Sequence, residues 1–275
     1  MNIKESLMDE MIFSEVDVLE IISKDGLFNT VSTVKKTIAE MYLKVYINEV
    51  EMISLLCLTR NLEELTLGFL FNEGVIESIE DVKKISYNDR MHVMHIILRD
   101  EIQVDRMASL RSVTASCGEC LTYINPLKQE LFRAVESRSD VYIGEIIKKM
   151  TEFERGSEIF SRIGSVHSAL LHTKEKDYFA EDLGRHNCID KVAGMMLLEE
   201  KLNLAEEAIL FTSGRVPSEI MIKAVRLGIP VVVSRTTPTL SAVSMAKQYN
   251  ITLIGYARKG GGIIYSCPER LKMNQ

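Results

Sequence analysis

The run Ala208-Ile-Leu-Phe-Thr-Ser-Gly-Arg-Val-Pro-Ser-Glu219 and the run Gly228-Ile-Pro-Val-Val-Val-Ser-Arg235 decide the fold class of this chain. Each contains a short apolar stretch, at 208–211 and at 230–233, that is typical of a buried strand. The segment between them predicts a helix, because Pro217 suits a first helical turn and a glycine follows the last helical residue. A strand, a helix and a second strand in this order indicate a parallel sheet with a right-handed crossover.

The same alternation extends over the C-terminal part of the chain. Strands are expected at 166–172, 177–180, 251–256 and 263–265, and helices at 187–201 and 240–249. Asn187 is the expected N-cap of the first of these helices. We therefore predict an α/β domain with a mostly parallel sheet over residues 156–275.

The N-terminal half predicts a smaller α+β domain over 37–125. Residues 40–48 alternate between apolar and polar side chains, which is typical of a half-buried strand. Further strands are expected at 51–57, 82–87 and 92–98, and a helix at 62–70 after an Asn61 cap. Residues 1–36 carry little signal and are interpreted as an arm or a first strand. A helical linker is expected over 126–155, with helices near 125–136 and 141–153.

Composition excludes several classes of protein. The chain has 275 residues and a formal net charge of −6, which argues against general nucleic-acid binding because phosphate binding calls for a basic surface. The N-terminus lacks the features of a signal peptide, and no apolar run is long enough to span a bilayer. Five cysteines are an odd number, which favours a reducing compartment over a disulfide framework. We expect a cytoplasmic protein that binds neither nucleic acid nor membrane.

The motif Cys117-Gly-Glu-Cys120 carries the most specific chemistry in the N-terminal half. Two thiols at this spacing can bind a metal, cycle as a disulfide or carry sulfur as a persulfide. His92 and His95 suggest a zinc site with these thiols, but residues three apart on a strand point to opposite faces. We therefore expect no metal site. Cys188 is a second, weaker candidate thiol, because a first helical turn stabilises a thiolate.

Four polar loops follow predicted strands of the C-terminal domain, at 184–187, 212–215, 234–239 and 258–262. Ligands bind beyond the carboxyl ends of parallel strands, where backbone N–H groups and arginines hold anions. Any one loop can be ordinary turn and capping chemistry, but four at one edge favour a phosphate-bearing ligand. None matches a Walker loop or a GxGxxG motif, which excludes a standard ATPase or dehydrogenase.

Several stretches together resemble one family, the formate dehydrogenase accessory sulfurtransferases (FdhD/NarQ), from about residue 40 to residue 270. They are Glu181-Asp-Leu-Gly-Arg-His-Asn-Cys-Ile-Asp-Lys191, Ser213-Gly-Arg-Val-Pro-Ser-Glu219, Gly228-Ile-Pro-Val-Val-Val-Ser-Arg235, Ala257-Arg-Lys-Gly-Gly-Gly-Ile-Ile-Tyr265, Leu65-Thr-Leu-Gly-Phe-Leu-Phe-Asn-Glu-Gly74 and Cys117-Gly-Glu-Cys120. The resemblance implies a C-terminal domain with a cytidine-deaminase-like fold and a homodimer. The zinc-binding pattern of a deaminase is missing, so no deaminase chemistry is expected.

The resemblance also implies a function. Sulfur from a cysteine desulfurase would load Cys117 as a persulfide, with Cys120 assisting, and pass to the bis-molybdopterin guanine dinucleotide cofactor (molybdenum or tungsten) of formate dehydrogenase. GDP is the expected mimic of that cofactor. Together with the loop analysis, the expected cofactor-binding residues are Tyr256, Ala257, Arg258, Lys259, Gly260, Gly261, Arg185, His186, Ser213, Arg215, Arg235 and Thr236. The alternatives are a chaperone that only holds the cofactor and a zinc or redox Cys-x-x-Cys module. The sequence departs from the family pattern at Leu121, Cys188 and Ser165.

Overall fold

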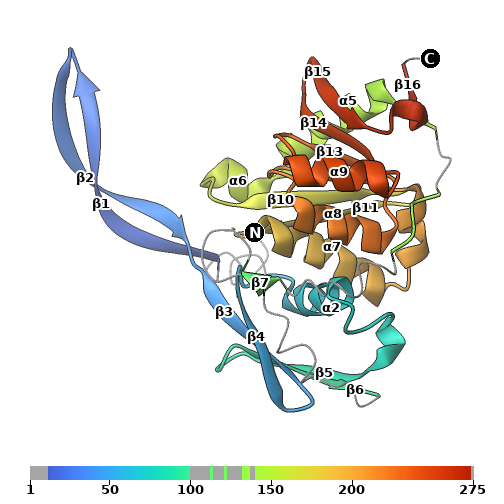
Figure 1. Ribbon diagram of the computed structural model, residues 1–275. Coiled ribbons are helices and arrows are strands. Elements are labelled where there is room, and N and C mark those ends of the chain that lie inside the picture. The colour runs from blue at the N-terminus through green and yellow to red at the C-terminus, as the bar shows by residue number, and fades with distance from the viewer. Residues whose placement is uncertain (1–11, 100–111, 114–120, 123–131, 137–139, 274–275) are drawn as a thin grey trace.

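The structure is a computed structural model, and it describes residues 12–99, 112–113, 121–122, 132–136 and 140–273. Figure 1 shows three parts: a hairpin that projects from the molecule, a small sheet with one helix, and a larger sheet packed between helices. No helix in these residues is long and apolar enough to cross a membrane. The motif cysteines Cys117 and Cys120 lie outside the described residues.

The larger sheet has six strands in the order β11-β10-β12-β13-β14-β15. The strands are β10 (His167–His172), β11 (Asp177–Asp182), β12 (Ile209–Thr212), β13 (Val231–Ser234), β14 (Thr252–Arg258) and β15 (Gly261–Ser266). The α/β class predicted from the sequence is confirmed. The parallel part is narrower than the expected mostly parallel sheet: β12, β13 and β14 are parallel, whereas β10 with each neighbour and β14 with β15 are antiparallel.

Side chains of these strands alternate between two apolar layers. Leu171, Leu210 and Val232 face α7 (Arg185–Leu198), α8 (Ser218–Leu227) and α9 (Leu240–Gln248). Leu170, Phe211 and Val233 face α5 (Ile143–Gly156). A strand that is buried on both faces has a continuous apolar sequence. This explains why the apolar stretches at 208–211 and 230–233 predicted strands. The short helix α6 (Glu158–Arg162) follows α5, and the 3₁₀ turns are η1 (Ile79–Asp81), η2 (Leu202–Glu207) and η3 (Pro268–Arg270).

The predicted starts of α2, α5, α8 and α9 are correct to within two residues, whereas the N-cap of α7 lies three residues before the expected one. This helix begins at Arg185 after Gly184, so Asn187 lies inside the helix and does not cap it. Its amide donates to the carbonyl oxygen of Leu56 at 2.8 Å and to the carboxylate of Asp182 at 2.8 Å. Residues 132–136, expected at the end of a linker helix, are not helical.

The small sheet has the order β4-β3-β6-β5, and its helix α2 packs against α7. Its elements are β3 (Met41–Ile47), β4 (Val50–Cys57), α2 (Leu62–Asn72), β5 (Val82–Asn88) and β6 (Val93–Leu98). The predicted alternation of β3 is confirmed, since Met41, Leu43, Val45 and Ile47 are buried. One continuous apolar core joins this layer to the α7 face of the larger sheet. The domain boundaries at 36/37, 125/126 and 155/156 remain predictions.

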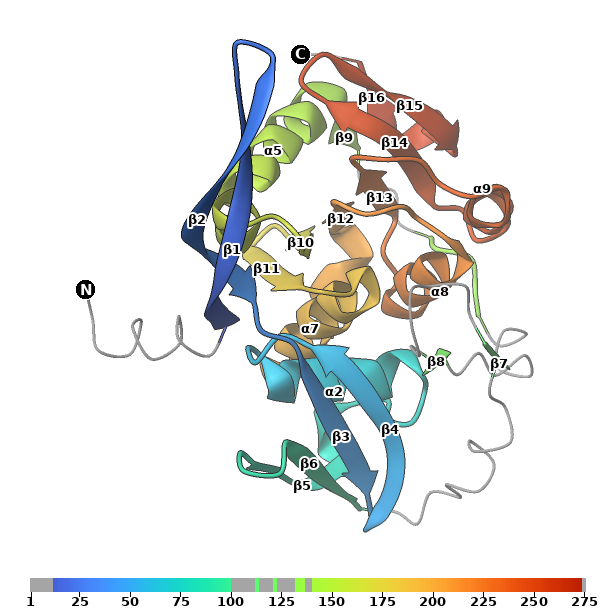
Figure 2. The ribbon, with the colours of Figure 1, turned by 90° about the vertical axis from the view of Figure 1, so that its left-hand side faces the viewer.

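The N-terminal segment forms a long hairpin of β1 (Phe13–Lys24) and β2 (Leu27–Ile38), coloured blue in Figures 1 and 2. Within the described part of the chain, these strands pair only with each other. The sequence predicted either an arm or a first strand over residues 1–36. The described part of this segment is an arm made of two strands. Two short pairs complete the described elements: β7 (Ser112–Val113) with β8 (Leu121–Thr122), and β9 (Val141–Tyr142) with β16 (Leu271–Lys272).

Candidate functional site

The four polar loops predicted from the sequence meet at one edge of the larger sheet. β11, β12, β13 and β14 all run in the same direction, so their carboxyl ends lie at this edge together with the amino end of β10. The loop at 184–187 follows β11, and the loops at 212–215 and 234–239 follow β12 and β13. The turn between β14 and β15 completes the row. The topology therefore brings the predicted loops together.

Hydrogen bonds connect the loop after β12 to the loop after β13, and the loop after β13 to the end of β14. Ser234 Oγ donates to the carbonyl oxygen of Gly214 at 2.8 Å, and Arg235 N donates to the carbonyl oxygen of Thr212 at 3.1 Å. Tyr256 N donates to the carbonyl oxygen of Thr236 at 2.8 Å. Hydrogen bonds within one turn would not connect loops that are far apart in sequence. The bonds between the loops hold this edge of the sheet in one conformation.

Arg185, His167 and the loop after β12 form a close group at the centre of the edge. A Cβ at Gly214 would lie 3.2 Å from the Arg185 side chain and 3.2 Å from His167 Nδ1, so glycine permits this approach. Ser213 Oγ accepts a hydrogen bond from Ser168 N at 2.9 Å and lies 3.5 Å from His167 Nδ1. The backbone and hydroxyl of the loop are thus held against β10.

The pKa values of two histidines at this edge, His167 and His186, are lowered. Burial first, and then the charges of Arg185 and Arg215, lower the pKa of His167. Burial, with Lys223, Arg185 and His167 nearby, lowers the pKa of His186 to about 3. Both imidazoles are therefore neutral at neutral pH, and the positive charge of the edge comes from arginine. His186 Nε2 is buried and has no hydrogen-bond partner among the described residues.

The start of α7 adds a favourable position for an anion. The N-cap residue of α7 is Gly184, which has no side chain. The N–H groups of the first turn therefore receive no hydrogen bond from an N-cap side chain. The dipole of a 14-residue helix favours negative charge at its N-terminus. Together with the guanidiniums and neutral imidazoles, this end of α7 can bind a phosphate group.

The β14–β15 hairpin carries the remaining predicted cofactor-binding residues. Arg258, Lys259, Gly260 and Gly261 are exposed around the turn, where φ is 123° at Gly260 and 142° at Gly261. Tyr256 is 43 % exposed and has a left-handed backbone (φ 52°), which turns its ring away from the sheet's core. The Ala257 side chain is buried, so only its backbone could meet a ligand.

Arg235 forms an ion pair with a carboxylate of another element. Its Nε lies 2.9 Å from Oε1 of Glu154 on α5. Thr236 is half-buried, and its backbone N–H donates to Ser234 Oγ at 3.0 Å. Both residues lie in the loop after β13, and a ligand that used Arg235 would compete with Glu154.

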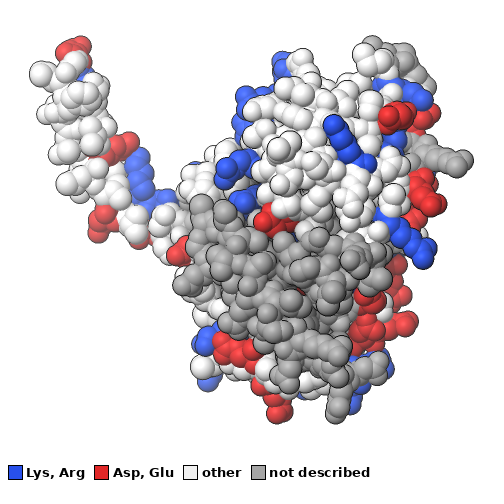
Figure 3. Space-filling view, viewed as in Figure 1, with Lys and Arg blue, Asp and Glu red and all other residues white. Residues whose placement is uncertain are grey.

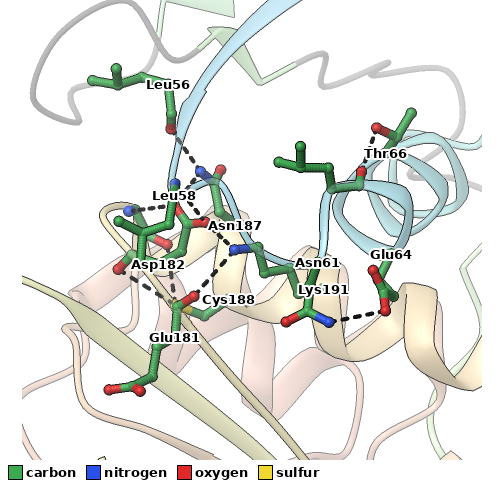
Figure 4. Close-up of polar contacts among 12 residues, drawn as sticks. Leu56, Leu58, Asn61, Glu64, Thr66, Glu181, Asp182, Asn187, Cys188 and Lys191 are labelled. Carbon is green, nitrogen blue, oxygen red and sulfur yellow. Dashed lines mark hydrogen bonds and ion pairs between the residues drawn. The ribbon is translucent and has the colours of Figure 1, made fainter. Parts of the chain in front are cut away.

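The family-like run at 181–191 contributes mainly to structure. Lys191 and Asp182 form an ion pair of 2.5 Å with both side chains fully buried, and Lys191 Nζ also donates to the carbonyl oxygen of Glu181 at 3.2 Å (Figure 4). Asp182 accepts the Asn187 amide and the backbone N–H of Leu58 at 3.3 Å (Figure 4). These contacts fix α7 against the strand before it and against the small sheet.

A second buried ion pair is formed by Asp190, the residue of α7 that directly precedes Lys191. Asp190 accepts from Lys223 Nζ at 2.6 Å and from the Asn72 amide at 2.7 Å. This pair joins α7 to α8 and α2. Of the predicted site residues in this run, the Arg185 side chain lies beside Gly214, and His186 is close enough to Arg185 and His167 for their charges to affect its pKa.

The cysteines within the described residues are poorly suited to sulfur chemistry. Cys57 and Cys188 are buried. Burial raises the pKa of Cys188 well above its usual value, and its Sγ donates to the carbonyl oxygen of Gly184 at 3.3 Å. Burial also raises the pKa of Cys267. The suggestion that the helix start activates Cys188 is therefore not supported, because the side chain points into the protein.

His92 and His95 do not form a metal site with other described residues. Groups of three or more metal-ligating side chains are absent from the part of the chain that the structure describes. His92 precedes β6 with φ 53°, and its Nδ1 lies 3.1 Å from the Tyr87 hydroxyl. His95 stacks near Tyr46, with ring centroids 5.4 Å apart.

Sequence reasoning did not assign His167 to the site. It lies at the start of an antiparallel strand, and its position at the edge depends on the pairing of β10 with β11 and β12. The apolar neighbours of His167 in sequence gave it the appearance of a core or pocket-wall residue. Only the sheet order brings it beside Arg185.

Comparisons with known proteins show the family and agree with the fold. The family model "FdhD/NarQ family" matches residues 38–272. The chain is 32% identical over 253 residues to proteins named "Sulfur carrier protein FdhD" from Staphylococcus aureus strains MRSA252 and Newman, covering 90% of this chain and 93% of each relative. A crystal structure of a protein described as a formate dehydrogenase accessory protein, from Desulfotalea psychrophila, superposes with a TM-score of 0.74 at 24% identity. It covers 94% of this chain and 99% of that one. This chain belongs to the FdhD/NarQ family.

Proposed function

We propose that this chain is a sulfur carrier that acts in the maturation of formate dehydrogenase. It takes sulfur from a cysteine desulfurase on Cys117 and delivers it to the bis-molybdopterin guanine dinucleotide cofactor, with molybdenum or tungsten, before that cofactor enters the enzyme. Membership of the FdhD/NarQ family and relatives named as sulfur carriers support the general role. The chemistry belongs to a reducing compartment such as the cytoplasm.

The observation that carries the proposal is the anion-binding edge of the larger sheet. A guanine dinucleotide brings a diphosphate, and the edge offers Arg185, Arg215, two neutral imidazoles and the N-terminus of α7. The unpartnered Nε2 of His186 is a buried group that a phosphate oxygen would satisfy. The cofactor is the substrate here, and the residues at the edge would bind and orient it.

Loading of sulfur needs a thiolate and an accessible persulfide donor. The Cys117 thiolate would attack the terminal sulfur of the desulfurase persulfide, a new S–S bond would form at Cys117, and the desulfurase cysteine would leave as a thiolate. The environments of Cys188 and Cys267, whose pKa values are raised, do not favour this reaction at those sites. This supports the motif thiols as the carriers, with Cys120 in an assisting role.

The test is to incubate the full chain with a cysteine desulfurase and cysteine and to analyse it by mass spectrometry. We expect an adduct of about 32 Da on the peptide that contains Cys117, lost in Cys117→Ala and retained in the control Cys267→Ala. The same adduct in Cys117→Ala would overturn the assignment.

Two further measurements separate the alternatives. Stoichiometric zinc in the purified protein, without an adduct, would support a zinc or redox module. Full activation of formate dehydrogenase by a variant with both Cys117 and Cys120 replaced would support a chaperone that needs no thiol. In the proposed function, that double variant still binds GDP and fails to activate the enzyme.

A further inference from the structure

The arm is defined as the hairpin Phe13–Ile38, and among the described residues it is held by the rest of the chain only at its base. Phe13 and Ile38 pack with Ile159 and Val166, and the Arg162 guanidinium lies 4.4 Å from the centroid of the Phe13 ring. From there the two strands project away from the molecule (Figures 1 and 2). A two-stranded ribbon is at best marginally stable in water by itself. An arm of 12-residue strands, about 40 Å long, therefore needs a surface to pack against.

The outer half of the arm has two unlike faces. The strand register places one set of side chains together, and none of them is charged: Leu19, Ile21 and Ser23 of β1 opposite Ser32, Thr30 and Phe28 of β2. We call this set the uncharged face. Leu19, Ile21 and Phe28 are 69%, 71% and 75% exposed. On the side of the arm visible in Figure 3, the outer part is mostly white, with charged side chains at the tip.

The opposite face is mixed. It carries Glu20, Ile22 and Lys24 of β1 opposite Val31, Asn29 and Leu27 of β2. Lys35 Nζ lies 3.0 Å from Glu20 Oε2 on this side. Charged side chains on an exposed strand pair keep it in water and discourage association. The uncharged face is therefore the docking surface, since contiguous exposed apolar patches mark interaction sites.

The uncharged face is complementary to itself. At each level of the ribbon a large apolar side chain stands opposite a small hydroxyl side chain: Leu19 with Ser32, Ile21 with Thr30, and Phe28 with Ser23. If two arms stack with β1 of one over β2 of the other, each large side chain meets a small one. A two-fold axis along the arm produces this arrangement, and such axes are the commonest symmetry of oligomers.

Charges at the base of the arm agree with the same axis. On the side of the arm that continues the uncharged face, Asp17 lies opposite Val34, and Glu15 and Lys36 are the next cross-strand partners toward the base. The two-fold axis places Glu15 of one copy over Lys36 of the other, and the reverse. Opposite charges then meet twice at the base of the contact, which favours correct pairing over alternatives.

We propose that the uncharged face of the arm packs on the same face of a second copy of this chain, with β1 of each copy over β2 of the other. The two ribbons form a two-layer sandwich in which Leu19, Ile21 and Phe28 of both copies are buried. The homodimer that the family resemblance implies would thus be assembled through the arm. This interface is separate from the sulfur chemistry at Cys117 and from the anion-binding edge.

The first test measures self-association of the full chain by sedimentation velocity across a dilution series. We expect a dimer that dissociates on dilution, on the order of micromolar because the contact is small. The variant Leu19→Ser/Ile21→Thr/Phe28→Ser is expected to weaken the dimer by about 100-fold or more, since three apolar contacts are lost twice. The matched control Ile22→Thr/Leu27→Ser/Val31→Thr changes the opposite face and is expected to dimerise like the wild type.

The second test exchanges a large and a small side chain. Leu19→Ser leaves a gap and Ser32→Leu crowds Leu19 of the other copy, so each weakens the dimer. Leu19→Ser/Ser32→Leu restores complementarity and is expected to recover association, which a partner of another kind would not explain. A monomer at every concentration, equal effects of the two triple variants, or no recovery in the exchange variant would overturn the proposal. Persulfide loading of Cys117, measured in parallel, reports on the proposed function independently.

Discussion

Gly68 of α2 and Gly194 of α7 bring the backbones of their two helices into direct contact. A Cβ at Gly68 would overlap the carbonyl oxygen of Asp190 and lie 2.7 Å from the backbone nitrogen of Gly194. A Cβ at Gly194 would overlap the carbonyl oxygen of Glu64. Because a backbone oxygen cannot turn aside as a side chain can, this separation requires glycine at both positions. The contact joins the small sheet to the helix that begins at the candidate site.

Alanine at either position should therefore destabilise the fold. We expect Gly68→Ala and Gly194→Ala each to lower the free energy of unfolding by about 3 kcal/mol, at the upper end of overpacking effects. Gly144→Ala in α5 is the control, since nothing lies within 4 Å of its added Cβ. That change should leave stability within about 1 kcal/mol of the wild type, on the stabilising side. Urea denaturation measures all three, and similar values for the three variants would contradict the close contact.

The buried ion pair of Lys191 and Asp182 gives a second prediction. Both side chains are fully buried, so removing the ammonium leaves an uncompensated carboxylate inside the protein. Lys191→Met is expected to cost about 3–5 kcal/mol of folding free energy. The exposed pair of Lys201 and Glu175, at 3.0 Å, is the control, and Lys201→Met should cost less than about 1 kcal/mol. A tolerated Lys191→Met would mean that Asp182 is neutral or hydrated in the folded protein.

Local sequence patterns predicted the elements well where one face of an element is buried. β3 shows this clearly: the apolar side of its alternation is the buried side, and its bounds, Met41–Ile47, lie within the expected 40–48. The arm gave no such signal, because both its faces mix apolar and polar residues and neither packs on this chain's core. Its strands became evident only from their pairing.

Long-range contacts explain the rest of the difference. Asn187 has the residue type and spacing of a helix cap, but its amide is taken by Leu56, 131 residues away, and by Asp182. The predicted loops met at one edge because β-α-β connections fix that edge from local order. His167 was missed because its place depends on an antiparallel strand inserted beside β12, which no short pattern specifies.

The low pKa of His186 predicts an acid-sensitive fold. The imidazole has a pKa of about 3 in the folded protein against 6.5 as the ordinary value, so between these pH values the unfolded chain binds the extra proton. Stability contributed by the neutral side chain is complete above pH 6.5 and is lost as pH falls, by roughly 2 kcal/mol between pH 7 and pH 5. Urea denaturation of His186→Gln should show a correspondingly weaker pH dependence. A pH dependence of His186→Gln equal to that of the wild type would contradict the prediction.

Binding of GDP gives the sharpest test of the anion-binding edge. Arg215→Ala and Arg258→Ala are each expected to weaken GDP binding by about 10-fold, since each removes a charged contact to phosphate. Arg99→Ala in the small sheet is the control and should leave the affinity unchanged.

The ion pair of Arg235 predicts a variant that binds GDP more tightly than the wild type. The Nε of Arg235 lies 2.9 Å from Glu154, so the carboxylate competes with any phosphate for the same guanidinium. Glu154→Gln removes the competing charge and should strengthen GDP binding by about threefold, whereas Arg235→Ala should weaken it. Glu154→Gln combined with Arg235→Ala should bind like Arg235→Ala alone, because the carboxylate acts only through that arginine. Isothermal titration calorimetry measures each affinity, and a gain from Glu154→Gln that persists without Arg235 would show that the carboxylate acts on the ligand by another route.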